Sequence, residues 1–470
     1  MERVLSGIEP RKVFEIFEDI CAIPHGSGNT KAISDYCVNF AREREFYVFQ
    51  DSAYNVIIKK PASAGYETHA PVILQGHLDM VCEKEAGLDF DFKRDRLRLR
   101  IDGDYLTASG TTLGADDGVA LAMALSILDD DTLKTPPLEV IFTSDEETGM
   151  NGAAALDGSL ITANRLISLD CGKEGAFTVG CAGGVCVGIK LPVETEKTAK
   201  TAYKVEISGL TGGHSGEEID KGRLNANKVL GAFLETLKDV RISEISGGNK
   251  DNAIPVSAVC VFSCEGDAQK AAEDFRNKNI IPADKDLKIT VTQQSADTFC
   301  TPNSSNKIIG LLNALPYGVQ AMSKKISGVV ETSLNLGIIK LSGDEFIASL
   351  YVRSSVAAEK EALKNKLISI GENFGAAADV YGDHPAWEFR ENSPLRKTAV
   401  ATFKEMYGRE PEIRIIHAGL ECGIFSDKID NIDAFAMGPD MFDIHTSRER
   451  LSISSLARTY SYICRVLEAL

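Results

Sequence analysis

The sequence has little of what marks membrane or secreted proteins. It contains one tryptophan and only 15 prolines in 470 residues, which is ordinary globular usage without collagenous or low-complexity bias. No apolar run reaches the roughly 18–20 residues that a membrane-spanning helix needs, and the longest candidate, residues 118–128, ends at an acidic run. The N-terminus mixes charges throughout and lacks the apolar core of a secretory signal. These absences predict a globular protein with no membrane partner.

Basic residues are scarce as well. Lys and Arg total 51 against 68 Asp and Glu, which gives a formal net charge of −17. Proteins that bind nucleic acid concentrate Lys and Arg to neutralise phosphates, so we expect no nucleic-acid partner. The surplus carboxylates are typical of a well-solvated surface.

The eleven cysteines are scattered along the chain and form no CxxC pair. An odd number of scattered thiols would be a liability in an oxidising compartment. We therefore expect reduced thiols and a cytoplasmic location, with the cysteines filling the core.

Strand and helix signals alternate in the first 185 residues. Short apolar runs at 55–59, 71–75, 138–143 and 165–169 indicate buried strands, and residues 119–128 indicate a helix. This alternation predicts an α/β domain with a mostly parallel central sheet. Antiparallel patterns prevail over residues 186–385, and the α/β pattern returns over 386–470. We expect an α+β domain, 186–385, inserted into an α/β domain made of 1–185 and 386–470.

Two motifs with carboxylates lie in the first domain, one after a predicted strand and one at the start of a predicted helix. His77 and Asp79 lie in GHLDMV, directly after the predicted strand 71–75. The Asp side chain can reach the His nitrogen that does not bind metal, although a structural hydrogen bond explains the pair equally well. Asp116 and Asp117 open the predicted helix in GTTLGADDGVALA. One Asp suffices for an N-cap, but the second carboxylate and the glycine-rich approach also suit a cation site, so both interpretations stay open for this motif alone.

Three further positions complete the pattern. Glu146 and Glu147 follow the predicted strand 138–143, and adjacent acids at a strand end favour either a bound cation or a solvated loop. Asp170 ends the strand pattern RLISLD, and His445 lies in FDIHTSRERLS; each alone is compatible with a structural role. Imidazoles and carboxylates without thiolates suit Zn, Mn or Co in a hydrolytic centre.

The ordered set GHLDMV, GADDG, EETG, SLD and DIHTSRE closely resembles the co-catalytic zinc peptidases that include aminoacylases and glutamate carboxypeptidases. Within them, GLTGGHSGEEIDKGRLNANKVL, DNAIP and HAGLECG resemble the Xaa-His and cytosolic non-specific dipeptidase branch over the full length. The resemblance implies a zinc-peptidase catalytic domain with an inserted lid and dimerisation domain. It also implies a hydrolase that cleaves small unblocked dipeptides.

The resemblance further implies two Zn²⁺ per subunit, for which Co²⁺ or Mn²⁺ can substitute. Asp116 would bridge the ions and precede a cis peptide bond to Asp117. The other implied metal ligands are His77 and Asp170 for one ion and Glu147 and His445 for the other. Glu146 would be the general base that activates the metal-bound water, and Asp79 the catalytic residue that orients His77.

Substrate binding is implied for four residues: His214, Asn252, Arg353 and Gly419. His214 in TGGHSG would stabilise the oxyanion, from its own or the partner subunit, although a His in a glycine-rich turn is often merely exposed. The Arg353 fork matches a free C-terminal carboxylate, with a strand-end salt bridge as the alternative.

Relatives also imply a homodimer. Three readings stay open: a dipeptidase, a tripeptidase or N-acyl amino acid deacylase with the same metal centre, and a non-catalytic peptide-binding scaffold. All five ligands, Asp79 and Glu146 are present, which favours an enzyme over a scaffold.

Overall fold

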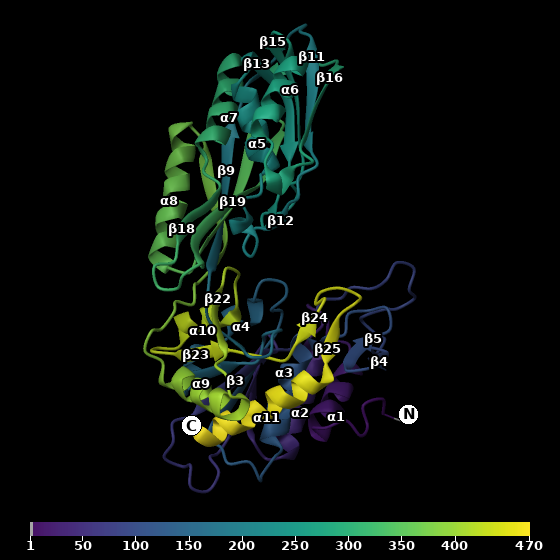
Figure 1. Ribbon diagram of the computed structural model, residues 1–470, viewed down its shortest axis with the longest axis vertical. Coiled ribbons are helices and arrows are strands. Elements are labelled where there is room, and N and C mark those ends of the chain that lie inside the picture. Colours follow the sequence, from purple (N-terminus) through teal and green to yellow (C-terminus); the bar gives the residue numbers. More distant parts are fainter. Residues whose placement is uncertain (1–2) are drawn as a thin grey trace. The chain divides into compact units, whose positions relative to one another are not determined.

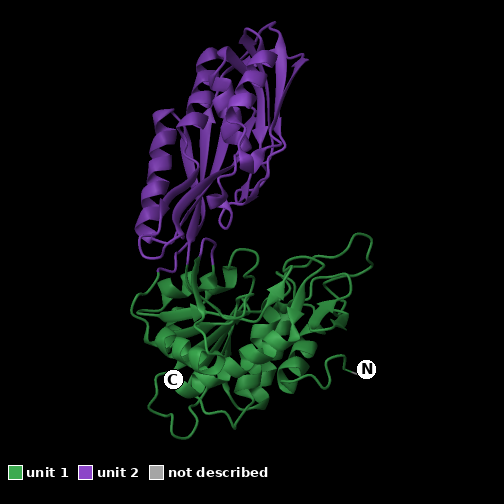
Figure 2. Ribbon diagram, viewed as in Figure 1, with its two compact units in different colours: residues 1–180, 389–415, 420–470 green, residues 181–388, 416–419 purple. Residues whose placement is uncertain are grey.

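The computed structural model describes residues 3–470, and the chain forms two compact units (Figure 2). Unit 1 contains the described residues up to Gly180 together with 389–415 and 420–470. Unit 2 contains residues 181–388 and 416–419. Each unit has its own large apolar core.

Unit 1 is built on an eight-stranded sheet in the order β1-β2-β6-β3-β7-β23-β8-β22. Four neighbouring strands in its middle, β6, β3, β7 and β23, run parallel, and β1, β2 and β8 pair antiparallel at the flanks. The bounds are β1 Tyr47–Gln50, β2 Val56–Lys60, β3 Val72–His77, β6 Leu138–Thr143, β7 Arg165–Ser168, β8 Ala176–Cys181, β22 Glu412–Ile416 and β23 Asp433–Ala436. The parallel centre confirms the predicted α/β class.

The central strands are buried on both faces, as their continuous apolar sequences predict. All six residues of β3 and of β6 are buried, which is typical of parallel strands covered by helices. Helix α3 packs on β3, α9 on β23, and α2 on β1 and β2 (Figure 1). Helices α1 and α11 pack in turn on α3. The bounds are α1 Arg11–Cys21, α2 Lys31–Glu43, α3 Ala115–Leu128, α9 Pro394–Tyr407 and α11 Ile453–Ala469.

Helix α3 is the innermost helix of unit 1. Every residue from Asp117 to Leu128 is buried, as expected for a helix that is apolar around its whole circumference. Because α3 is packed on all sides, the residues at its N-terminus have a fixed position relative to the central sheet.

Unit 1 also contains a small four-stranded sheet in the order β24-β25-β5-β4. Its strands are β4 Leu99–Asp102, β5 Tyr105–Ala108, β24 Met441–Phe442 and β25 Arg450–Ser452. Residues 443–449 connect β24 to β25 and carry His445. Two short helices, α4 Asn151–Ala155 and α10 Glu421–Lys428, pack on each other.

Unit 2 contains a long antiparallel sheet formed by two modules with the same β-α-β-β-α-β order. The first runs β11-α5-β13-β15-α6-β16, with strands arranged β16-β11-β15-β13. The second runs β9-α7-β19-β20-α8-β21, with strands arranged β19-β20-β9-β21. The first module is inserted between β9 and α7 of the second. Strands β13 and β19 join them through the pairs Ser246↔Lys340 and Gly247↔Ile339.

The bounds in unit 2 follow the same order. The strands are β9 Gly183–Pro192, β11 Ala202–Ser208, β13 Lys238–Gly247, β15 Ala258–Glu265, β16 Lys288–Gln294, β19 Val330–Ser342, β20 Glu345–Ser354 and β21 Ala377–His384. The helices are α5 Ala226–Glu235, α6 Ala268–Asn279, α7 Pro302–Ala314 and α8 Ala357–Asn373. Two short strands, β12 Gly213–His214 and β14 Ala253–Ile254, pair with each other, and β18 Gly318–Met322 pairs with β19. Strands β10 Thr195–Lys197 and β17 Thr298–Cys300 form a separate pair.

Among residues 3–470, no helix combines the length and the apolar character that crossing a bilayer requires.

Candidate metal centre

The predicted ligands of unit 1 meet at one edge of the central sheet. His77 is the last residue of β3, Glu146 and Glu147 follow β6, and Asp170 follows β7. Strands β6, β3 and β7 are parallel neighbours. Their carboxyl ends therefore bring these four side chains together, at the place where α/β sheets carry their sites.

The start of α3 brings Asp116 to the same edge. Asp116 departs from helical backbone, with φ −85° and ψ 101°, and the Asp116–Asp117 peptide bond is cis. The Asp117 carboxylate accepts the His77 backbone N–H at 3.1 Å. A Cβ at Gly76 would lie only 2.6 Å from that carboxylate, so the glycine of GHLDMV permits α3 to approach β3 closely.

Three groups of side chains have ligand atoms within 4.8 Å of one another. One is His77, Asp116 and Asp170; another is Asp116, Glu147 and His445; the third is His77, Glu146 and Glu147. The first two share Asp116, which is the arrangement that a carboxylate between two cations requires. All five predicted ligands belong to these groups.

Asp116 lies between the two imidazoles. Its Oδ1 is 3.2 Å from His77 Nε2 and its Oδ2 is 3.1 Å from His445 Nε2. His445 Nε2 also lies 2.8 Å from Glu147 Oε1. The two oxygens of Asp116 thus face different histidines.

Asp79 links His77 to the two glutamates. His77 Nδ1 lies 3.0 Å from the backbone oxygen of Asp79 and 3.5 Å from its carboxylate. The same carboxylate accepts the backbone N–H of Glu146 at 2.9 Å, the N–H of Glu147 at 3.3 Å and the Ser27 hydroxyl at 2.7 Å. Burial raises the pKa of Asp79, but His77 and these donors outweigh burial and keep the pKa below its usual range.

The cluster holds more negative charge than its own cations balance. Burial raises the pKa of Glu146 well above its usual value, and burial together with Asp116 raises the pKa of Asp170. Hydrogen bonds to Asp116 and Glu147 raise the pKa of His445 to about 10. Partly buried carboxylates with raised pKa values and a histidine with a raised pKa both indicate a place that attracts cations.

The donor chemistry fits divalent metal ions. The two groups that share Asp116 offer imidazole nitrogens and carboxylate oxygens and no thiolate. That donor set suits Zn, Mn or Co at hydrolytic centres. Residues of unit 1 can therefore hold metal ions at this edge of the sheet.

Two buried carboxylates beside the cluster were missed by sequence reasoning. Glu421, at the start of α10, accepts hydrogen bonds from Gln75 and from the Thr143 hydroxyl, both at 2.6 Å, and burial raises its pKa to about 8. Glu449 accepts backbone N–H groups near Asp116. Neither follows a predicted strand, and only the position of Glu449 four residues after His445 hinted at a role.

In unit 2, His214 and Asn252 lie side by side. His214 in β12 pairs with Ala253 in β14, and the backbone oxygen of Asn252 accepts the Ser215 N–H at 2.9 Å. His214 Nδ1 accepts the backbone N–H groups of Gly216 and Glu217 at 3.3 and 3.1 Å. Its Nε2 therefore carries the hydrogen of the neutral ring and is available as a donor.

Arg353 in β20 is the third predicted residue of this region. A Cβ built on Gly216 would lie 3.2 Å from Arg353 Nε and 3.0 Å from His214 Cε1, so these two side chains flank the same glycine. Arg353 is 4% exposed, and its guanidinium carbon lies 4.3 Å from the centre of the Tyr351 ring. Its buried Nε has no hydrogen-bond partner, and no carboxylate among residues 3–470 forms an ion pair with Arg353. The described residues therefore show no strand-end salt bridge at Arg353.

Gly419 lies in the segment 416–419 that belongs to unit 2. Two residues before it, His417 is buried, and its Nε2 lies 2.7 Å from the Ser333 hydroxyl. The His417 backbone oxygen would lie 2.2 Å from a Cβ on Gly216. Gly419 is thus close in sequence to His417, whose backbone approaches Gly216. His214 and Arg353 flank Gly216 directly, and Asn252 bonds to Ser215 beside it.

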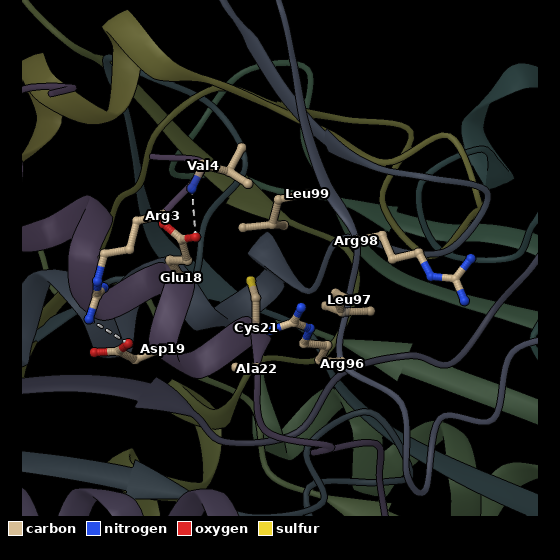
Figure 3. A pocket seen from close by; sticks show the side chains of 10 residues that line it. All are labelled: Arg3, Val4, Glu18, Asp19, Cys21, Ala22, Arg96, Leu97, Arg98 and Leu99. Atoms are coloured by element: carbon tan, nitrogen blue, oxygen red, sulfur yellow. Dashed lines mark hydrogen bonds and ion pairs between the residues drawn. The ribbon is translucent and has the colours of Figure 1, made fainter. Parts of the chain in front are cut away.

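A cavity of about 500 Å³ in unit 1 has a different lining (Figure 3). It lies between α1 and residues 96–99, and none of its lining residues is a predicted site residue. Arg3 forms an ion pair with Asp19 at 2.8 Å, and Glu18 accepts the backbone N–H of Val4 at 2.8 Å. These charged groups hold the N-terminal segment against α1, so we assign the cavity a structural origin.

Comparison with known proteins places the chain in one family. Residues 73–469 match the peptidase family M20/M25/M40. The chain is 36% identical to the cytosol non-specific dipeptidase of Escherichia coli (strain K12), over 99% of this chain and 98% of that protein.

Solved structures of peptidases are also similar to this chain. The crystal structure of aminoacylhistidine dipeptidase from Vibrio alginolyticus superposes with a TM-score of 0.91 at 34% identity, covering 99% of this chain and 98% of that one. Aminopeptidase PepT from Bacillus cereus shares the fold, with a TM-score of 0.57 at 17% identity, over 98% of this chain and 99% of that one.

Proposed function

Because the chain belongs to the peptidase family M20/M25/M40, we propose that it is a two-metal dipeptidase. Its substrates are small unblocked dipeptides, of the Xaa-His type or of broader specificity. The observation that carries the proposal is the pair of ligand groups that share Asp116, with Glu146 beside them. The relatives named above support the dipeptide as substrate.

The proposed metal ligands fall into two sets. His77, Asp116 and Asp170 hold one ion, and Asp116, Glu147 and His445 hold the other. This choice leaves Glu146 out of coordination, although Glu146 also belongs to the third group. We propose Zn²⁺ for both positions, with Co²⁺ or Mn²⁺ as substitutes, because the donor set suits all three.

The proposed reaction divides the work between metal and protein. The ions supply Lewis acidity, which lowers the pKa of water and polarises a carbonyl. Glu146 takes a proton on its carboxylate and delivers it to the leaving amine. The partly buried Glu146 side chain lies in one group with His77 and Glu147, close to the proposed ions, where it can hold that proton between the two steps.

Asp79 is the proposed positioning partner of these groups. Its carboxylate accepts the backbone N–H groups of Glu146 and Glu147, and its backbone oxygen lies at His77 Nδ1. One residue thereby fixes the tautomer of a metal ligand and the place of the general base.

Arg353 is the proposed receptor for the free C-terminal carboxylate of the substrate. A buried guanidinium without an acidic partner is costly, and a substrate carboxylate would satisfy it with two parallel hydrogen bonds. His214 offers an Nε2–H donor for the oxyanion, and Asn252 and Gly419 are the further proposed substrate contacts.

The proposal also covers the roles of the two units, the oligomeric state and the location of the enzyme. Units 1 and 2 are the catalytic domain and the inserted lid domain, and the lid mediates a homodimer. The enzyme acts in the cytoplasm, as the name of the Escherichia coli relative states for that protein. A tripeptidase or an N-acyl amino acid deacylase with the same metal centre is less favoured, because the relatives with 34–36% identity are dipeptidases.

The test is product analysis by mass spectrometry. Zinc-loaded protein is incubated with a mixture of L-dipeptides that includes Xaa-His, one tripeptide and one N-acetyl amino acid. We expect the dipeptides alone to disappear. A metal-stripped sample should leave every substrate intact, and activity should return when Zn²⁺, Mn²⁺ or Co²⁺ is added.

Each other result has a definite meaning. Cleavage of the tripeptide or the acetylated substrate instead would move the protein to a sister activity with the same centre. No turnover by protein that binds two zinc ions would replace the enzyme with a peptide-binding scaffold. Full activity after metal removal would overturn the proposed chemistry.

A further inference from the structure

Glu449 holds the backbone that leads to Asp116. Its side chain accepts four backbone N–H groups in succession: those of Leu113 at 2.7 Å, Gly114 at 3.0 Å, Ala115 at 2.8 Å and Asp116 at 3.3 Å. The residue is only 2% exposed. A single carboxylate from the C-terminal part of the chain therefore fixes the whole approach to the proposed bridging ligand.

Part of this arrangement is ordinary helix capping. Gly114 stands at the N-cap of α3 with a left-handed backbone, φ +68°, and has no side chain with which to cap the helix. The first N–H groups of a helix need acceptors, and the positive end of the helix dipole favours a carboxylate. A local Ser, Thr, Asp or Asn at the N-cap would meet that need, so capping alone does not explain an acceptor more than 330 residues away.

The position of Glu449 in its own loop supplies the second reason. His445, a ligand of the same proposed ion as Asp116, lies four residues earlier in the connection between β24 and β25. Three contacts brace this connection at Glu449: its backbone N–H reaches Thr446 O at 3.1 Å, its oxygen accepts the Thr107 hydroxyl at 2.9 Å, and its carboxylate reaches the 113–116 loop. Asp443 and His445 both have positive φ, 52° and 62°, so the loop needs such anchors to keep its shape.

Glu449 is also a buried, unpaired carboxylate close to the proposed metal centre, where it is electrostatically unfavourable. Among residues 3–470 it forms no ion pair, although it is only 2% exposed. A further buried acid beside a cluster of carboxylates destabilises the metal-free protein. Such a residue is expected where it gains something for the site.

We propose that Glu449 is a positioning residue that sets Asp116 opposite His445 and so shapes the second metal site, made of Asp116, Glu147 and His445. The inference rests on the proposed function. It assigns Glu449 no contact with substrate. The first site, with His77 and Asp170, is anchored by β3 and β7 and depends on Glu449 only through Asp116.

The test compares Glu449→Gln with a matched control, Glu139→Gln. The Gln side chain keeps the shape of Glu. Its NH2 group, however, replaces a carboxylate oxygen that accepts backbone N–H groups, so that donors face donors. Glu139 is another 2%-exposed carboxylate that accepts backbone N–H groups, those of Thr162 and Ala163, near the opposite end of β6 from Glu146. Both substitutions should lower the melting temperature, whereas only Glu449→Gln should change metal binding.

The main readout is calorimetric titration of metal-stripped protein with Zn²⁺, with the visible spectrum of the Co²⁺ form as a check on ligand geometry. We expect parent and Glu139→Gln to bind two ions per chain. Glu449→Gln should bind one ion nearly as the parent does and the second about 10–100-fold more weakly, the usual effect of losing a group that orients ligands. At saturating zinc, its kcat should fall while KM for a dipeptide stays within about threefold.

Glu449→Asp keeps the charge and the acceptors on a shorter side chain and should recover part of the second-site affinity. It also replaces Glu449→Gln if the amide variant does not fold. Two ions bound at parent affinity by the variant that is measured, with an unchanged Co²⁺ spectrum, would overturn the inference and leave the proposed function intact. A parent that binds no metal would overturn both.

Discussion

The two units carry opposite kinds of incomplete site. In unit 1, carboxylates crowd around His77 and His445, and the acids outnumber the cations. In unit 2, Arg353 is a buried cation that forms no ion pair with any of residues 3–470. Burial and Arg353 itself lower the pKa of its neighbours His214 and His417. One region lacks positive charge and the other lacks negative charge.

The comparison indicates what each region takes up. In the proposed function, a divalent metal neutralises the excess of carboxylates in unit 1, and a substrate carboxylate neutralises Arg353 in unit 2. Both sites therefore cost stability when empty and recover it on binding. A protein selected for stability alone would avoid both features.

The largest expected effect comes from removing the base in unit 1. Glu146→Gln should lower kcat by about 10²–10⁴-fold, the range for loss of a general acid–base residue. Metal content should stay at two ions, because Glu146 is not a proposed ligand. Steady-state kinetics with metal analysis tests both statements.

The neighbouring acid provides the control for that experiment. Asp145 precedes Glu146 in the same loop, belongs to none of the three ligand groups, and accepts the Gly28 N–H at 2.7 Å. Asp145→Asn should keep kcat within about threefold. A Glu146→Gln enzyme as fast as the parent would remove Glu146 from the mechanism.

The next effect addresses the unpaired cation in unit 2. Arg353→Met should lower kcat/KM for dipeptides roughly 10–100-fold, since hydrogen bonds to a charged group are worth about 1.5–3 kcal/mol. The same change should raise the melting temperature of the free protein, because it removes a buried, unpaired charge. Activity and stability are thus expected to move in opposite directions.

Arg241 offers the matched comparison. It is also buried in unit 2, but it is paired with Glu196 and donates to Cys300 O at 2.9 Å. Arg241→Met should lower the melting temperature and leave KM unchanged. If Arg353→Met instead destabilised the protein without affecting kcat/KM, Arg353 would be a structural residue.

The last effect is on stability and not on activity, and it concerns the histidines around Arg353. Burial, then Arg353 and His214, lower the pKa of His417 from 6.5 to about 3. The unfolded chain therefore binds a proton below pH 6.5 that the folded protein does not. The free energy of unfolding should fall as the pH drops from 6.5 toward 3, at most by about 1.4 kcal/mol per pH unit from this residue.

His417→Gln isolates that contribution. The amide can still bond with the Ser333 hydroxyl but does not titrate, so the variant should show a shallower loss of stability between pH 6.5 and 4. The fluorescence of Trp387, the one tryptophan of the chain, reports unfolding of unit 2, where it is 3% exposed. Identical slopes for variant and parent would show that His417 is protonated without penalty.

Sequence reasoning worked best for the centre of unit 1. The strand predicted at 138–143 coincides with β6, and those at 71–75 and 165–169 differ from β3 and β7 by no more than two residues at either end. Parallel strands buried on both faces leave continuous apolar runs, and polar residues directly after such runs stand out. His77, Glu146, Glu147 and Asp170 were therefore visible without any tertiary information.

Unit 2 and the supporting carboxylates were much less visible. The repetition of one β-α-β-β-α-β order in two modules leaves no matching motifs in the sequence, because antiparallel pairing depends on alternation and not on particular residues. Arg353 looked like either a ligand group or a salt bridge until its neighbours were known. Glu421 lay in HAGLECG and Glu449 ended DIHTSRE, but no local pattern assigned a role to either acid.

The sequence by itself determined the type of chemistry, since the kinds of residue that hold a cation and move a proton follow recognisable local patterns. Only the tertiary structure decided which charges are balanced. Glu449 meets the 113–116 loop across more than 330 residues, and no acid among residues 3–470 forms an ion pair with Arg353. Hydrogen bonds and ion pairs depend on distances of about 3 Å, and the packing of the chain, which no local pattern encodes, sets those distances.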